Sequence, residues 1–378
     1  MRVAQSRWTG SEWVEEGAAP AAADLVLAFG AREVFTRAVV GAIRERHPGA
    51  SVLGCSTAGE IAGARVYDGS VVTTAVTFAS TRIATARERI EARADSRNAG
   101  ARLAARLAKD DLVHVFVLSD GLVVNGSELT RGLAEGLPPG VAVTGGLSGD
   151  GARFGITEVC LDGAPVSHEV IALGLYGKSL RVGYGSLGGW DPFGPDRLVT
   201  RAEGSVVFEL DERPALDLYR EYLGDHAAGL PASGLLFPLS IRNEAGGLVR
   251  TILDIDEGAR SLTFAGDVPQ GAYARLMRAS SDRLIDGATG AARAAVAALP
   301  NASAELAILI SCVGRKLVLK QRVEEEVEGV RDVLGAGATL AGFYSYGELC
   351  PSASGACSDL HNQTMTITTL SEDVCTSS

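Results

Sequence analysis

The sequence predicts an α/β protein made of two related halves, each a mixed β-sheet with helices, and their likeness indicates an internal duplication. In the first half, an apolar run at 25–29, a segment of helical spacing at 34–43 and an apolar run at 51–53 form a β-α-β unit. The same order returns at about 305–370. In both halves a strand ends in glycine, four mostly small or hydroxylated residues, and Gly-Glu, at Gly54–Glu60 and Gly342–Glu348.

Length and composition indicate an ordinary globular protein of two domains. The chain has 378 residues, which exceeds the size at which one core usually keeps growing. Its net charge is −11 and it has no long basic run, so we expect no nucleic-acid partner. It has no apolar stretch long enough to span a bilayer, and its N-terminal residues do not resemble a secretory signal. We therefore expect a cytoplasmic protein without membrane insertion, whose six cysteines are free thiols.

The remaining elements follow from apolar runs and turn residues. Residues 1–23 form an Ala-rich lead-in with weak patterning. The segment at 82–90 is expected to return antiparallel to a strand at 71–78, and a long Ala-rich segment predicts a helix over 271–299. Further strands are expected at 112–118, 141–144, 169–176, 305–311, 339–342 and 364–370, and further helices at 127–137, 214–223 and 323–334.

The polar loops at the strand ends are the predicted ligand site, because open α/β sheets place their sites there. Glycines let backbone N–H groups approach a carboxylate, hydroxyls add donors, and the two loop glutamates could hold an ammonium group. The alternative is that the glycines serve tight turns and the acids cap them. The candidate residues in and beside the two Gly-Glu loops are Cys55, Ser56, Thr57, Gly59, Glu60, Tyr344, Ser345, Tyr346 and Glu348.

Two arginines are candidates for binding a ligand carboxylate. Arg315 follows a strand and a glycine, and Arg315 with Glu348 is the best cation–anion pair that the sequence offers for an α-amino acid. Arg250 lies inside a predicted strand, where an internal salt bridge with Asp254 is the favoured interpretation.

Other candidates have a structural interpretation beside the functional one. His361 and Asn362 precede the last strand, and His361 could contact a ligand or a haem iron or simply hold a loop in place. The spacing of Cys350, Cys357 and His361 could suit zinc, but a fourth ligand is not evident, so we expect no metal.

Cys55 could act as a nucleophile, although a small residue at a buried strand end explains it equally well. Asp120 and Asn125 flank a strand-to-helix turn, where each could contact a ligand or cap the helix.

Several motifs, in this order, resemble the FIST family of bacterial sensory proteins. They are Gly54–Glu60, Ser119–Gly121, Gly145–Asp150, Glu209–Ala215, Leu236–Leu239, Ser311–Arg315, Gly342–Glu348 and Leu360–Thr364. The resemblance covers about residues 24–372. It implies a FIST N-like domain at 24–223 and a FIST C-like domain at 224–372, between the lead-in at 1–23 and a tail at 373–378.

The resemblance implies a non-catalytic module that senses a small ligand, such as an amino acid or a related carboxylate metabolite. Because no residues remain for an output domain, the signal is expected to pass to a partner such as a histidine kinase. Two alternatives stay open. One is a haem-based sensor of a gas such as nitric oxide, since some relatives are associated with haem. The other is an enzyme acting on a small carboxylate, for which no catalytic triad or phosphate-binding pattern is present.

Overall fold

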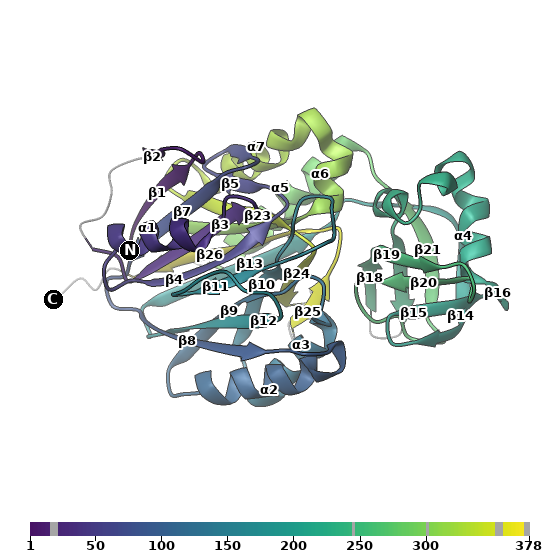
Figure 1. Cartoon of the computed structure of the whole chain (residues 1–378), viewed down its shortest axis with the longest axis horizontal. Coiled ribbons are helices and arrows are strands. Elements are labelled where there is room, and N and C mark those ends of the chain that lie inside the picture. Colours follow the sequence, from purple (N-terminus) through teal and green to yellow (C-terminus); the bar gives the residue numbers. More distant parts are fainter. Residues whose placement is uncertain (16–21, 244–245, 300–301, 352–357, 374–378) are drawn as a thin grey trace.

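The chain folds into two lobes of unequal size (Figure 1). The computed structural model describes residues 1–15, 22–243, 246–299, 302–351 and 358–373. The larger lobe holds three mixed β-sheets made from both ends of the sequence, and the smaller lobe holds one antiparallel sheet made from its middle. The sequence prediction of a mixed α/β fold is therefore confirmed.

Sheet A has the strand order β11-β4-β3-β7-β1-β2. Strands β3 and β4 run parallel and are joined by helix α1, whose first turn is capped by the Thr36 hydroxyl, and β7 pairs antiparallel with β3. The elements are β1 (Arg2–Trp8), β2 (Trp13–Glu15), β3 (Leu25–Ala31), α1 (Arg37–Arg46), β4 (Ser51–Thr57), β7 (Val71–Thr77) and β11 (Val159–Leu161).

Sheet C has the order β25-β24-β10-β9-β12-β8. Its parallel pair is β9 and β10, joined by α3, and β12 pairs antiparallel with β9. Helices α2 and α3 pack together and cover it (Figure 1). The elements are β8 (Arg82–Arg89), α2 (Ser96–Leu107), β9 (Leu112–Ser119), α3 (Gly126–Gly136), β10 (Ala142–Leu147), β12 (Glu169–Tyr176), β24 (Gly347–Pro351) and β25 (Ser358–His361).

Sheet B has the order β13-β26-β22-β23-β5-β6. Its parallel pair is β22 and β23, joined by α6 and α7, and β26 pairs antiparallel with β22. Helix α5 packs on β13, β26 and α7. The elements are β5 (Glu60–Ala62), β6 (Arg65–Tyr67), β13 (Leu180–Leu187), α5 (Ser281–Ala297), β22 (Leu306–Cys312), α6 (Val313–Leu319), α7 (Val323–Leu334), β23 (Thr339–Ser345) and β26 (Met365–Glu372).

The three sheets share one local order and exchange strands in a closed cycle. In each sheet, a parallel pair is joined through helix and a third strand pairs antiparallel with the first. The strand that follows each parallel pair then joins a neighbouring sheet. Strand β5 leaves sheet A for β23, β24 leaves sheet B for β10, and β11 leaves sheet C for β4. The common order thus occurs three times in the described residues, whereas the sequence predicts two halves.

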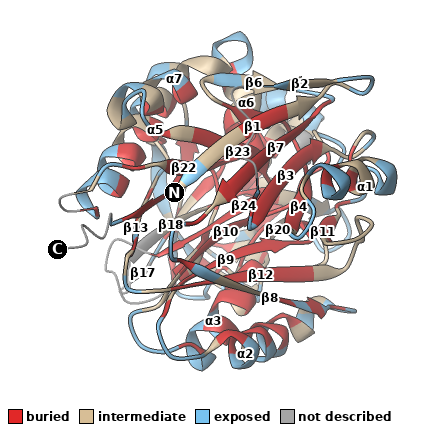
Figure 2. Cartoon of the chain, turned by 90° about the vertical axis from the view of Figure 1, so that its left-hand side faces the viewer, coloured by how far each residue is buried: buried red, intermediate tan, exposed pale blue. Residues whose placement is uncertain are grey.

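An apolar core fills the space among the three sheets. Phe29 of sheet A and Phe343 of sheet B lie with ring centroids 4.7 Å apart, and Phe116 of sheet C belongs to the same buried cluster. Buried residues run along these central strands, whereas the outer faces of α1 and α2 are exposed (Figure 2). Burial of this apolar surface is the main source of stability for the larger lobe.

The smaller lobe has the strand order β18-β17-β21-β14-β15-β20-β19, with β16 beside β15. Helix α4 packs on it, and Leu216 and Tyr219 of α4 are buried in its core. Two chain crossings, at 188–190 and 279–280, join it to the larger lobe. The elements are β14 (Asp191–Glu203), β15 (Val206–Leu210), β16 (Arg213–Pro214), α4 (Ala215–Leu223), β17 (Leu239–Asn243), β18 (Gly246–Arg250), β19 (Ile252–Asp256), β20 (Ser261–Phe264) and β21 (Tyr273–Arg278).

Three sequence expectations about elements need correction. Strand β8 pairs with β12 in sheet C, so the expected pairing of 82–90 with 71–78 is wrong. The stretch at 1–23 contributes β1 and β2 to sheet A, where β1 pairs with β7 along its length. The helix expected over 271–299 begins at Ser281, because β21 occupies its first residues. Each error concerns a partner or boundary set by distant residues, which local periodicity does not encode.

Candidate functional site

The two Gly-Glu loops lie side by side in the larger lobe. The backbone N–H of Ala58 donates to the Tyr344 carbonyl at 2.8 Å, and the N–H of Tyr344 donates to the Gly59 carbonyl at 2.8 Å. Strand β5, which begins at Glu60, continues the contact along β23. The distant strand ends therefore meet in space.

The loop after β10 joins the same place. The N–H of Gly149 donates to the Ser56 carbonyl at 2.9 Å, and the N–H of Tyr346 donates to the Leu147 carbonyl at 3.1 Å. The hydroxyl of Ser56 accepts from the N–H of Glu158 at 2.9 Å. These contacts are direct, so the three loops pack against one another rather than around an open hollow.

Both loop glutamates have the same surroundings. Thr57 donates its hydroxyl to Glu60 at 2.7 Å, and Ser70 donates to the other carboxyl oxygen through its hydroxyl at 2.8 Å and its N–H at 3.2 Å. Ser345 donates to Glu348 at 2.7 Å, and Thr364 donates to its other oxygen through hydroxyl and N–H at 2.9 and 3.2 Å.

These carboxyl groups are buried and already paired with the protein. Burial raises the pKa of Glu60 to about 7 and that of Glu348 to about 8, against the opposing effect of the donated hydrogen bonds. Both carboxyl oxygens of each residue accept bonds from strand ends of the neighbouring sheet, so neither is directed toward an ammonium group of a ligand.

Arg315 forms an ion pair, but with Glu326 and not with Glu348, so the predicted pair is wrong. Its Nε and Nη2 donate to Glu326 at 3.1 and 2.7 Å, and the remaining bonds go to the carbonyls of Gly188 and Leu284. Glu326 also accepts the Tyr344 hydroxyl at 2.7 Å. Arg315 and Glu326 both have side chains that are 0% exposed, so this pair is part of the interior.

Asp120 and Tyr346 hold turns in the same region. Asp120 accepts N–H bonds from Leu122 and Val123 at 2.8 and 2.9 Å, so it closes the turn before α3, whereas the cap of that helix is Asn125. Tyr346 stacks on Phe154 with ring centroids 4.3 Å apart, and burial raises the pKa of its hydroxyl.

Cys55 lies in the apolar core among the sheets, and no histidine lies beside it among its hydrogen-bonded strand neighbours. Burial, with a smaller contribution from Cys160, raises the pKa of its thiol well above the ordinary value. A thiol of raised pKa is a poor nucleophile at neutral pH. The four cysteines that the structure describes are free thiols, as expected.

His361 and the suggested zinc ligands are not brought together as a metal site. Nε2 of His361 lies 3.1 Å from the Cys350 carbonyl oxygen, and burial lowers the pKa of the ring. Cys357 lies outside the described residues. Within the described ranges, no group of three His, Cys, Asp or Glu side chains could hold a metal ion.

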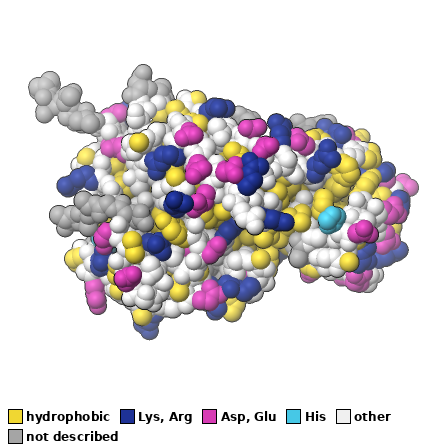
Figure 3. Space-filling model, turned by 90° about the horizontal axis from the view of Figure 1, so that it is seen from above, with side chains coloured by type: hydrophobic (Ala, Val, Ile, Leu, Met, Phe, Trp, Pro, Cys, Tyr) yellow, Lys and Arg dark blue, Asp and Glu magenta, His cyan; other side chains and the backbone are white. Residues whose placement is uncertain are grey.

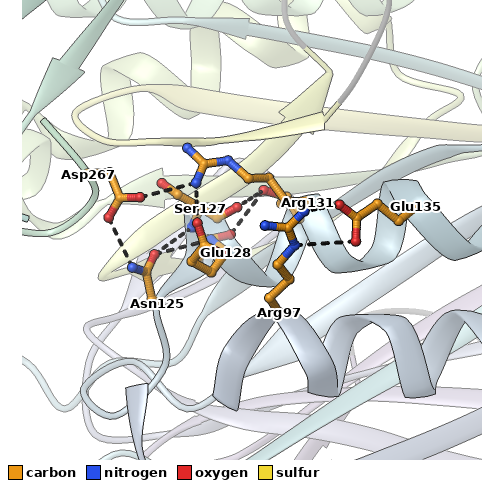
Figure 4. A network of polar contacts seen from close by, with 9 residues as sticks. Arg97, Asn125, Ser127, Glu128, Arg131, Glu135 and Asp267 are labelled. Carbon is orange, nitrogen blue, oxygen red and sulfur yellow. Dashed lines mark hydrogen bonds and ion pairs between the residues drawn. The ribbon is translucent and has the colours of Figure 1, made fainter. Parts of the chain in front are cut away.

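Asn125 lies where the lobes meet, and Asn362 directly follows strand β25, which packs there. Strand β25 packs against both α3 of the larger lobe and β18 of the smaller lobe. Asn125 caps α3 and donates its amide to Asp267 of the smaller lobe at 3.0 Å, and Arg131 reaches the same carboxylate at 3.3 Å (Figure 4). Seen from above, this junction is a waist between the lobes, with hydrophobic side chains gathered on the smaller lobe near it (Figure 3).

The junction contains buried polar atoms that lack partners in the described part of the chain. Asn362 is 1% exposed, and neither its amide nitrogen nor its amide oxygen has a hydrogen-bond partner. The amide oxygen of Gln363 and the hydroxyl of Thr251 are also unpaired. Buried polar groups are usually paired, so this group of atoms distinguishes the junction from the fully paired loops.

Arg250 also lies at the junction, although the sequence favours a salt bridge with Asp254 for it. It is 4% exposed and donates to the backbone carbonyls of Asp267 at 3.1 Å and Leu360 at 2.8 Å. No carboxylate of the described residues forms an ion pair with it, so the expected salt bridge with Asp254 is wrong. Burial lowers its pKa to about 10. A charged residue inside a predicted strand indicates a special role, but it does not identify the partners, because Asp267 and Leu360 lie farther along the chain.

Two family models match the chain in succession. A model described as the FIST N domain matches residues 24–213, and one described as the FIST C domain matches residues 215–351. The chain therefore belongs to the FIST family, a family of sensory domains, as its motifs predict. No helix in the described ranges is both long and apolar enough to cross a membrane.

Relatives occur in mycobacteria. An uncharacterized protein of Mycobacterium tuberculosis (strain ATCC 25618 / H37Rv) is 29% identical over 234 residues, which cover 57% of each chain. An uncharacterized protein of Mycobacterium bovis (strain ATCC BAA-935 / AF2122/97) is 28% identical over 230 residues, again 57% of each chain. The similarity thus spans little more than half the length of these relatives, and their names state no ligand.

Proposed function

We propose that this protein is a non-catalytic, cytoplasmic sensory module that binds a small ligand, an amino acid or a related carboxylate metabolite, at the lobe junction. Its signal passes to a separate partner, such as a histidine kinase. We also propose that the repeated strand order of the larger lobe arose by internal duplication.

The observation that carries the proposal is the unpaired amide of Asn362. An asparagine side chain offers two N–H donors and one carbonyl acceptor, so it can pair with a carboxylate and an ammonium group at once. Leaving such a group buried without partners costs about 1–3 kcal/mol, which a polar ligand would recover. The loops at the strand ends, in contrast, already have their hydrogen bonds within the protein.

The junction also supports a signalling role. Asn362 belongs to the larger lobe, and the contacts of Asn125 and Gln363 cross to Asp267 and Leu235 on the other side. A ligand held there touches groups from both lobes, so its affinity depends on how the lobes are placed. Unequal affinity for two arrangements is what a ligand needs in order to shift a conformational equilibrium.

The other two functions gain no such support. An enzyme using Cys55 would need an activating base, and its thiol is buried in apolar surroundings. A haem sensor using His361 would need a free ring nitrogen and a large cavity beside it, whereas Nε2 is within hydrogen-bond distance of Cys350. The sensor proposal is therefore the one that the described residues support best.

A thermal-shift screen of the twenty amino acids and their deaminated analogues tests the proposal. Binding at about 100 times Kd should add about 2.7 kcal/mol to the free energy of unfolding and raise the melting temperature. Asn362→Leu should lose the response, while Asn98→Leu, at an exposed position on α2, should keep it. The proposal fails if no compound raises the melting temperature, or if Asn362→Leu responds like the wild type.

A further inference from the structure

Arg250 is a buried cation with which no carboxylate of the described residues forms an ion pair. The side chain is almost completely buried, and it donates only to neutral carbonyl groups of Asp267 and Leu360. The carboxylate of Asp267 binds Asn125 and Arg131. Burial lowers the pKa of Arg250, and the attraction of Asp267 and Asp359 offsets only part of that effect. A buried cation is costly without a counter-charge, and a guanidinium group fits a carboxylate with two parallel hydrogen bonds.

One chain segment packs closely against the guanidinium group of Arg250. Gly266 lies against it, and a Cβ on Gly266 would stand 3.1 Å from Cζ of Arg250 and 3.0 Å from Cδ2 of Leu360. These contacts are tighter than ordinary van der Waals contact, so only glycine lets this chain segment pass the guanidinium group without a shift.

Leu360 connects Arg250 to the unpaired amide of Asn362. Its carbonyl accepts from Arg250, and its side chain lies 2.9 Å from the position of a Cβ on Gly347. Nδ2 of Asn362 lies 3.6 Å from that same position. Arg250 and the amide therefore flank one leucine, with a buried positive charge on one side and an unpaired donor and acceptor on the other.

We infer that Arg250 is the anion-binding residue of the lobe junction and takes a carboxylate group. This inference deepens the proposed function and rests on it. Because Arg250 belongs to the smaller lobe and Asn362 to the larger one, a carboxylate compound held by both links the two lobes. Arg250 then binds the ligand carboxylate, the role that the sequence suggests for Arg315. The charge of Arg315 is already neutralised by Glu326.

The test uses sodium acetate, the simplest stable carboxylate probe, against sodium chloride at equal ionic strength. Acetate should raise the melting temperature of the full chain in a saturable way, and methylammonium chloride should not. Arg250→Met should weaken acetate binding by about 10- to 100-fold, the range expected for hydrogen bonds to a charged group. Arg201→Met removes an exposed arginine of the same lobe and should leave acetate binding unchanged.

Arg250→Lys covers the case in which Arg250→Met does not fold, as judged by circular dichroism. It keeps the positive charge and loses the planar pair of donors, so acetate affinity should still fall. The inference is overturned if the folded Arg250→Met, or otherwise Arg250→Lys, binds acetate like the wild type, or if acetate and chloride act alike on the wild type.

The amino-acid screen separates this inference from the proposed function. If amino acids stabilise the wild type and Arg250→Met equally, the sensor proposal stands and the carboxylate assignment to Arg250 falls. If acetate binds through Arg250 but no amino acid or deaminated analogue does, the anion site stands and the proposed ligand class falls. If neither acetate nor any amino acid binds, both fall.

Discussion

The loops at the strand ends and the lobe junction are both buried and polar, but they differ in how completely their polar atoms are paired. In the loops, both oxygens of Glu60 and Glu348 accept hydrogen bonds, and Arg315 has a carboxylate partner. At the junction, the Asn362 amide has no partner among the described residues, and none of their carboxylates forms an ion pair with Arg250. Pairing, rather than the residue type or its place at a strand end, separates a polar core from a candidate binding site.

The strongest way to test this contrast is to break the buried ion pair of the loop region. Arg315→Met leaves the carboxylate of Glu326 buried without a counter-charge, so the free energy of unfolding should fall by about 3–5 kcal/mol. Urea denaturation measures the change. Arg201→Met, which breaks the exposed pair with Glu209, should cost no more than about 1 kcal/mol.

A double variant shows whether the cost comes from the unpaired charge. Arg315→Met with Glu326→Leu replaces the whole pair by apolar side chains and should recover most of the lost stability. If the free energy of unfolding of Arg315→Met lies within about 1 kcal/mol of the wild-type value, the buried pair with Glu326 does not stabilise the interior.

The loop glutamates should make stability depend on pH near neutrality. Burial raises the pKa of Glu348 to about 8, above the ordinary value of 4.5 that applies in the unfolded chain. The contribution of Glu348 to the free energy of unfolding is therefore fully present below about pH 4.5 and is lost as the pH rises through 8. Glu60, with a pKa of about 7, acts in the same direction. Glu348→Gln should flatten the fall in stability between pH 5 and about 8, as measured by urea denaturation at a series of pH values.

Glu372 provides the matched control, because its pKa moves in the opposite direction. Burial opposes the shift, but hydrogen bonds from the N–H groups at 79–81 and from the Thr81 hydroxyl lower its pKa to about 2. Its contribution is present above pH 4.5 and lost as the pH falls toward 2. Glu372→Gln should therefore leave the slope above pH 5 unchanged. Equal slopes for Glu348→Gln and the wild type would show that Glu348 titrates as an exposed group.

The smallest effect is expected at the junction, where a substitution should stabilise the protein. Asn362→Leu removes an unpaired buried amide, so the free energy of unfolding should rise by about 1 kcal/mol, while the response to amino acids is lost. Asn98→Leu, on the exposed face of α2, should change stability by less than about 0.5 kcal/mol. A loss of stability in Asn362→Leu would mean that the amide already has a partner.

Local patterns in the sequence were sufficient for much of the fold but for only part of the site. The strand at Leu306–Cys312 and the helix at Val323–Leu334 follow from apolar periodicity, and the glycines of the loops mark the strand ends. These features depend on neighbours within about one element, which is the range that periodicity reports. The convergence of Gly54–Glu60 with Gly342–Glu348 joins distant segments instead, and only their matching sequences indicated it.

Other contacts between distant residues could not be predicted. The partner of Arg315 is Glu326 on the next helix, and choosing it over Glu348 requires knowing which way α7 faces. Likewise, Arg250 and Leu360 are separated by 110 residues, so nothing in the sequence near either one indicates their contact. The junction between lobes is a property of the assembled chain rather than of any one motif.

The cyclic exchange of strands has a consequence for how the protein is synthesised. Sheet B combines β5, near the beginning of the chain, with β22, β23 and β26, near its end. Sheet C is likewise incomplete until β24 and β25 have been synthesised. A nascent chain leaving the ribosome therefore cannot complete any two neighbouring sheets until almost the last residue has been added. Such sequence-distant pairing slows folding, and it leaves early strands such as β3 and β4 with an uncovered apolar face during translation.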